Sequence, residues 1–214
     1  MDNKLFTFFD SLWGYIDNGK FYRNPFSLLY IVIASLNLLF PLHVIYVTLE
    51  CGVFEYISGG KALAIIIIFF LLAFLGLMSF HLWINRQKKI KEYFGSDKEF
   101  IVIPIVSHFI QTLGEWIGFY IGIGGCVISL IFVIFGLNDY LLGEVLGNSL
   151  LPIGVSLMTV VIYPIMGFLI VVAGRLTAEL YKVLTSIANN TKKIVENSHK
   201  EDAKKSQIRD ESQF

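Results

Sequence analysis

Four long apolar runs alternate with short polar segments along this chain of 214 residues. Each run has about the 20 residues that a helix needs to cross the hydrocarbon core of a bilayer. The pattern therefore predicts an all-α integral membrane protein with four transmembrane spans, at 26–49, 62–84, 117–137 and 150–174. The composition agrees, because 55% of the residues are hydrophobic and soluble domains are about 45–50% apolar.

The basic residues are distributed unevenly among the segments that connect these runs. Every Lys and Arg except Lys61 falls in the N-terminus, in the connection 85–99 or after Gly174. The positive-inside rule then places both termini in the cytoplasm, with 50–61 and 138–149 as outer loops. We accordingly expect a multi-pass protein of the inner (plasma) membrane.

The apolar stretch from Phe100 to Leu137 is too long for one span, since it would form a helix of roughly 57 Å. Dividing it into two spans would place the basic C-terminus outside, against the charge distribution. We therefore predict an interfacial helix over 100–116, with Pro104 as the candidate kink, that leads into the third span.

The two ends of the chain differ from the transmembrane domain, which we expect over 25–182. Within 1–24, apolar residues recur at helical spacing. This pattern predicts an amphipathic segment that lies either in the inner interface or docked on the span ends. Spacings of three and four continue past the last span and predict a cytoplasmic helical extension over 183–197. The polar tail 198–214 has no apolar period and is expected to be disordered.

Small and polar residues share one face of the third predicted span. The small ones form a candidate packing face of Gly114, Gly118, Gly122, Gly125 and Ser129. Glycines four residues apart allow another helix backbone to approach closely. The polar ones form a stripe of His108, Gln111 and Glu115. This face indicates a close helix contact or, alternatively, a lined pathway through the membrane.

Two charged residues adjoin spans directly, both at the predicted inner surface. Glu115 precedes the third span and Arg175 follows the fourth. Because a partly desolvated carboxylate needs a cation, we expect these two to form an ion pair, with Glu179 as a competing acceptor. The alternative is that Arg175 extends to a lipid phosphate while Glu115 faces water.

The sequence contains no recognisable catalytic motif, metal-ligand cluster or phosphate-binding glycine loop. It therefore predicts no enzymatic activity, no cofactor and no metal. No basic run is interleaved with aromatic residues, so a nucleic-acid partner is not expected. Cys51 and Cys126 fall at different predicted depths, and we expect no disulfide between them.

The end of the last span carries Pro164, Gly167 and Phe168, followed by Arg175, Glu179 and the apolar positions Ile187 and Ile194. This stretch resembles the terminal part of a bacterial family of small multi-span inner-membrane proteins of unknown function. The resemblance implies a bacterial inner-membrane protein and supplies no activity.

Two hypotheses of function follow from these patterns. The first is a non-catalytic protein, embedded in the lipid bilayer, that associates with itself or with membrane-protein partners. It would use the glycine face of the third span and the helix after Arg175. The alternative is a small channel or transporter, in which the polar stripe lines the pathway.

Overall fold

The computed structural model describes residues 7, 9–11, 13–14, 20–93, 102–137 and 155–211. Its long helices are α2 (Lys20–Glu50), α3 (Gly59–Tyr93), α4 (Val102–Phe119), α5 (Cys126–Phe135) and α7 (Leu157–Glu211). The short η1 (Val53–Glu55) lies between α2 and α3, and a π-helical turn, η2 (Tyr120–Gly125), joins α4 to α5. The described residues contain no strand.

In the described part of the chain, four helical segments are long and apolar enough to cross a membrane: Asn24–Glu50, Gly59–Ile90, Val102–Phe135 and Leu157–Glu201. Their hydropathy comes from runs of Leu, Ile, Val and Phe, in which every backbone polar group must be paired within the helix when lipid surrounds it. The predicted all-α fold with four spans is therefore confirmed, and the chain is a multi-pass membrane protein.

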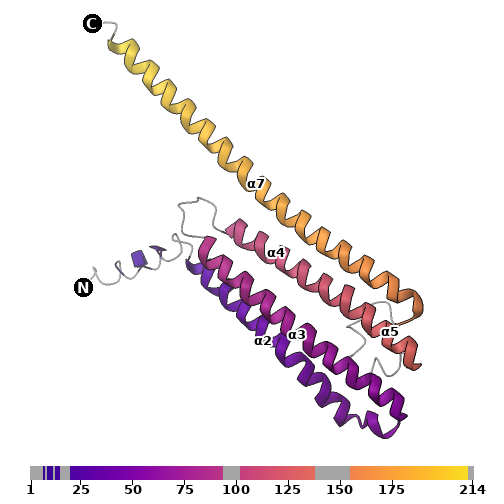
Figure 1. The fold of residues 1–214 in the computed structure, drawn as a ribbon. Helices are drawn as coiled ribbons and strands as arrows, with labels where there is room; N and C mark the ends of the chain where they lie inside the picture. The colour runs from indigo at the N-terminus through magenta and orange to yellow at the C-terminus, as the bar shows by residue number, and fades with distance from the viewer. Residues whose placement is uncertain are drawn as a thin grey trace.

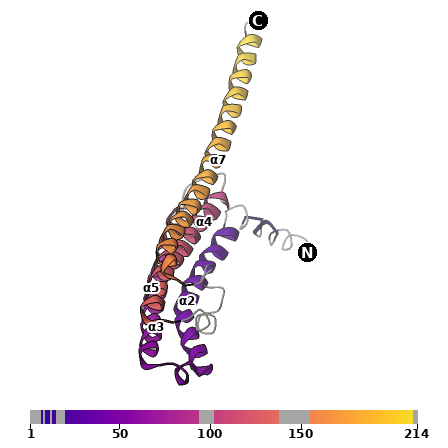
Figure 2. The same ribbon diagram turned by 90° about the vertical axis from the view of Figure 1, so that its right-hand side faces the viewer.

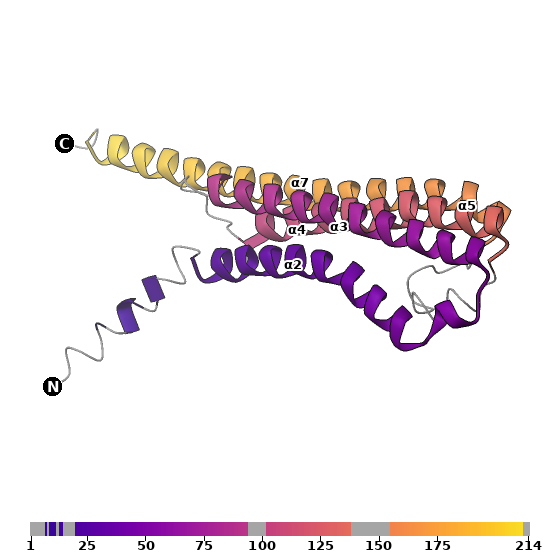
Figure 3. The ribbon, with the colours of Figure 1, turned by 60° about the horizontal axis from the view of Figure 1, so that its bottom comes forward.

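The helices lie side by side, with α4 between α3 and α7 (Figure 1). The α7 helix packs along α4, η2 and α5, whereas α2 packs mainly along α3. Figure 3 shows that the second half of α2 diverges from the other helices. This half contains Pro41, and a proline inside a helix removes a hydrogen bond and commonly kinks it.

Among the described residues, many of the buried apolar side chains gather in two clusters. One joins α2, α3 and α4 near the end where α7 leaves the bundle, and it is centred on Tyr30 and Trp83, whose ring centroids are 4.9 Å apart. The other lies toward η1 and includes Leu72, Phe132 and Tyr163. Aromatic rings bury large areas and prefer edge-on contacts of this kind, so the first cluster fixes how these three helices meet.

The segment predicted as an interfacial helix over 100–116 is helical from Val102 and leads directly into the third span, through the π-helical turn η2, as far as Phe135. This segment is held in line with the rest because Gly114 packs on Gly174 and the Ser107 hydroxyl donates to the Ala178 carbonyl at 2.7 Å. A helix longer than the hydrocarbon is thick needs no break if its end projects beyond the lipid.

Pro104 introduces no kink. It lies in the first turn of α4, where the backbone N–H groups have no acceptor within the helix, so the missing donor has no cost.

The predicted disorder after residue 197 is also replaced by helix, since α7 continues to Glu211. The sequence after Gly174 contains neither glycine nor proline to stop the helix. Lys192 and Glu196, one turn apart, add an ion pair at 3.8 Å. Figures 1 and 2 show that this part of α7 stands clear of the other helices. The predicted extension over 183–197 is thus part of a longer helix.

Two predictions fall largely outside the described residues. The amphipathic segment 1–24 is described only at 7, 9–11, 13–14 and 20–24, and the outer loop 138–149 lies wholly outside. The fourth span, predicted from residue 150, is described from 155 onward.

Candidate functional site

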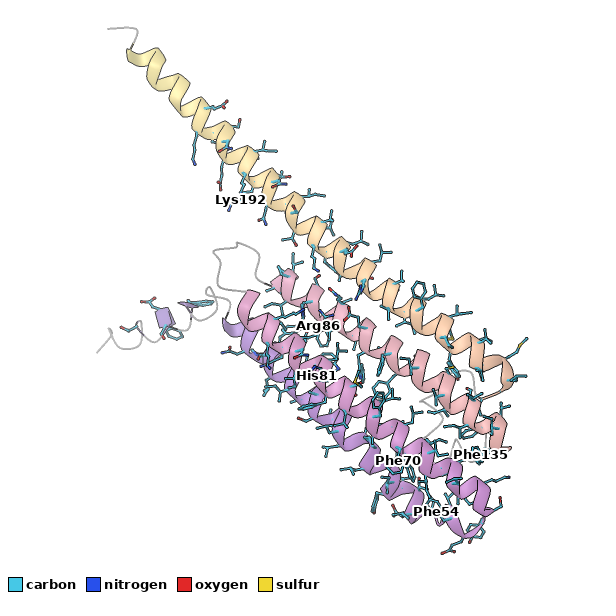
Figure 4. The ribbon with its side chains drawn as sticks, in the orientation of Figure 1. Phe54, Phe70, His81, Arg86, Phe135 and Lys192 are labelled. Carbon is cyan, nitrogen blue, oxygen red and sulfur yellow. The ribbon has the colours of Figure 1, made fainter. Side chains whose placement is uncertain are left out.

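The Glu115 carboxylate is shared by two arginines on different helices. Arg86 of α3 donates to its Oε2 at 2.5 Å, and Arg175 of α7 donates to its Oε1 through Nε and Nη2 at 3.1 and 2.9 Å. Gln111, one turn earlier on α4, also donates to Oε1 at 3.1 Å. The structure therefore brings together the predicted pair and adds a third member, Arg86, which Figure 4 labels.

The three charged side chains differ in exposure. The Glu115 side chain is 11% exposed and that of Arg86 is 20% exposed, whereas that of Arg175 is 56% exposed. A carboxylate in such surroundings is stabilised by charge-assisted hydrogen bonds. Glu179, the predicted competitor, forms no ion pair with Arg175 in the described part of the chain.

The depth of this cluster follows from helix length. The segment from Glu115 to Phe135 is about 30 Å long, and that from Leu157 to Arg175 is about 27 Å. Both lengths match the thickness of a hydrocarbon core, which is about 30 Å. With Phe135 and Leu157 at one hydrocarbon boundary, these lengths would put the Arg86–Glu115–Arg175 cluster at the other boundary, where charged groups can reach water and lipid head groups.

Three further polar contacts join α4 to α2. The Tyr30 hydroxyl lies 2.9 Å from Nδ1 of His108 and 3.5 Å from the Thr112 hydroxyl. The Trp116 indole donates to Oδ1 of Asn37 at 2.9 Å. His108 thus belongs to a helix contact, and its Nε2 is buried with no hydrogen-bond partner in the described structure.

Three residues of these contacts, Arg86, Tyr30 and Asn37, are not among those that the sequence pattern predicts. Arg86 was assigned to the connection 85–99, although α3 continues through it to Tyr93. Asn37 carried a usable signal, because an amide in the middle of an apolar span is costly unless it is hydrogen-bonded. Tyr30 carried none, since a tyrosine near a span end is ordinary.

The predicted glycine face packs against α7 of the same chain. A Cβ at Gly118 would lie 2.6 Å from the Gly167 carbonyl oxygen, and one at Gly114 would lie 2.9 Å from the Gly174 Cα. Gly122 also meets Gly167, and Gly125 faces the Tyr163 ring. Because this face is buried against α7 of the same chain, association with another chain must use a different surface.

The last member of the face, Ser129, continues the same contact. The Thr159 hydroxyl of α7 donates to the Ser129 hydroxyl at 3.0 Å, and both residues are buried. The face that could have lined a pathway is therefore filled by side chains and backbone of α7 along this stretch.

A cavity of about 480 Å³ lies elsewhere, between α2 on one side and α4 with η2 on the other. Its lining is almost wholly apolar and comprises Ile33, Leu36, Asn37, Phe40, Trp116, Ile117, Tyr120 and Ile121. It does not touch the predicted polar stripe.

The described residues contain no group of three His, Cys, Asp or Glu side chains that could hold a metal ion. Cys51 is exposed and Cys126 is partly buried, and both are free thiols.

The fold and the site define a class: an all-helical, multi-pass membrane protein whose helices are fastened by glycine contacts and by one shared carboxylate. No protein-family model, curated protein or solved structure matches the chain. The resemblance of residues 164–194 to a bacterial membrane family stays a prediction.

Proposed function

We propose that this protein is non-catalytic and acts by association, with itself or with partner proteins, through the exposed face of α7 beyond Arg175. The observation that carries the proposal is an exposed apolar row on this part of the helix. Its side chains are between 54% and 68% exposed: Leu176, Leu180, Val183, Ile187 and Ile194. Exposed apolar patches of this kind mark sites of interaction with proteins or membranes.

The row lies on the side of α7 that faces away from α4. Ala178 and Thr185, which are buried, lie on the opposite side, where α7 packs against the bundle. The apolar row therefore makes no contribution to the packing of its own chain. Burying it against a second helix would remove apolar surface from water, at about 25 cal/mol per Å².

The spacing of the row is that of a helix–helix seam, which is the line of side chains that faces a partner helix in a coiled coil. The positions alternate at four and three residues from Leu176 to Ile194, with Asn190 and Asn197 at the two seam positions that are not apolar. A polar Asn at a seam position fixes register and oligomeric state at some cost in stability. These features support a specific partner helix over a lipid surface.

The proposed orientation in the inner membrane limits how two copies could pair. The basic segments favour a cytoplasmic location for both termini, so every copy projects α7 from the same face. Two such helices in one membrane are parallel, which sets each seam residue opposite its own copy. A homodimer would therefore place Asn190 opposite Asn190, where amides can hydrogen-bond to each other.

Cysteine cross-linking in membranes tests this proposal. In full-length chains with Cys51→Ser and Cys126→Ala, we expect Ile187→Cys and Ile194→Cys to give disulfide-linked dimers on mild oxidation. Ala188→Cys is the matched control, because it is exposed and adjacent but lies off the seam.

Equal cross-linking at 187 and 188, or none at either seam position, would contradict pairing of two copies. A mass of the detergent-solubilised complex equal to one chain would exclude self-association. Association through this row is contradicted if Ile187→Ser with Ile194→Ser leaves the size of the complex isolated from native membranes unchanged.

A further inference from the structure

The polar stripe of α4 lies between two basic helices. Because α4 sits between α3 and α7, the face carrying His108, Gln111 and Glu115 is flanked by Arg86 on one side and Arg175 on the other. The α3 and α7 helices pack on α4 and scarcely on each other. His108, Gln111 and Glu115 thus form the middle of a polar strip, and the basic residues of α3 and α7 form its two edges.

The positive charge of this strip exceeds its negative charge. Glu115 neutralises one of its two arginines, and further basic residues follow on each edge: Lys89 on α3 and Lys182 on α7. Both lysines are exposed, and both lie close enough to act on His108 electrostatically. Even with Glu179 counted, four basic residues face two acidic ones.

Arg175 is the arginine of this strip that is most accessible to a ligand. Its guanidinium is the most exposed of the three charged groups, and Nε and Nη2 are the nitrogens that meet Glu115. The backbone beside it is fixed, since Gly114 and Gly174 are in contact. A guanidinium held in this way has donors left over and loses little side-chain entropy when it binds an anion.

We propose that this strip binds the phosphate of an anionic membrane lipid, with Arg175 as the main donor and Lys89 and Lys182 as supporting cations. The ligand follows from position and charge. The helix lengths given above would put the cluster at one hydrocarbon boundary, where lipid phosphates are concentrated, and basic residues near an anionic surface each contribute about 1 kcal/mol to lipid attraction. The inference does not depend on association through α7.

Binding of defined lipids to the full-length protein tests the site. Native mass spectrometry in detergent would compare phosphatidylglycerol with zwitterionic phosphatidylcholine of the same chain length. We expect a preference for phosphatidylglycerol that falls about 25-fold in the double variant Lys89→Gln with Lys182→Gln, or roughly fivefold per charge. This variant leaves the Glu115 ion pairs intact, so loss of fold does not account for the result.

Lys193→Gln is the matched control, because it removes another exposed charge from α7 outside the strip. An equal loss in this control, or no preference for phosphatidylglycerol in the unaltered protein, would overturn the proposal. A further arm adds inorganic phosphate. Displacement of the lipid by millimolar phosphate, with the same dependence on Lys89 and Lys182, would assign the strip to a soluble phosphate compound and reject the lipid.

Discussion

At the scale of single residues, Glu115 is the point at which three helices are joined. Its carboxylate accepts from Arg86 on α3 and from Arg175 on α7, and it is carried by α4 itself. The pair with Arg175 was predictable because both charges adjoin apolar spans. Arg86 was not, because a sequence pattern does not show where a helix ends beyond the lipid, and α3 continues to Tyr93.

Replacing the shared carboxylate should cost more than replacing its exposed partner. We expect Glu115→Gln to lower the free energy of unfolding by about 3 kcal/mol, since it leaves two arginines facing each other without an acceptor charge. Arg175→Gln should cost about 1 kcal/mol or less, because that side chain is largely exposed. Equilibrium unfolding in mixed detergent micelles measures both, and equal losses would contradict the shared arrangement.

At the scale of elements, the contact between α4 and α7 depends on glycine. The spacing of Gly114, Gly118 and Gly122 predicted a close helix contact, but the partner was not predictable from spacing alone. The complementary residues are Gly167 and Gly174, seven apart on α7, and their match appears only when the two helices are aligned. The π-helical turn Tyr120–Gly125 was equally hidden, since it has no sequence pattern of its own.

A methyl group at this contact should separate the helices. A Cβ at Gly167 would lie 2.5 Å from both the Gly118 carbonyl oxygen and the Gly122 Cα, and neither backbone atom can move independently. We expect Gly167→Ala to destabilise the protein by about 2–3 kcal/mol. Gly122→Ala should cost less, because its Cβ would lie 3.3 Å from the nearest atom.

Gly60→Ala is the control for this series. No atom lies within 4 Å of a Cβ placed there, so the change should stay within about 0.5 kcal/mol of the original stability. Thermal unfolding followed by circular dichroism would rank the three variants. A loss at Gly60 comparable to that at Gly167 would mean that backbone freedom, rather than helix contact, governs these positions.

At the scale of the whole molecule, hydropathy predicted the number and order of the spans well. It did not predict how far the helices extend past the lipid, because nothing in water forces an apolar or amphipathic helix to stop at the boundary. In the structure the segment from Val102 leads directly into the third span, and the stretch after 197 is helical to Glu211. Packing on α7 and the absence of helix-stopping residues decided these two segments.

The arrangement of the whole bundle bears on the channel hypothesis. We expect a water-soluble thiol reagent to label Val102→Cys, which replaces a partly exposed residue, and to leave Ser129→Cys unlabelled, because that position is buried against Thr159. The native Cys51 and Cys126 are first replaced. Rapid labelling at 129 would indicate water along the α4–α7 contact and would favour a pathway over packing.

The projecting part of α7 also sets a distance. From Thr185 to Glu211 the helix is about 40 Å long, and it continues the axis of the segment that is fastened to α4 by glycine. Because the projecting part is a straight helix, a small tilt of α7 relative to α4 at the glycine contacts would move its C-terminal end by several ångströms. A molecule bound at that end would therefore shift sideways whenever the packing of α4 against α7 changes.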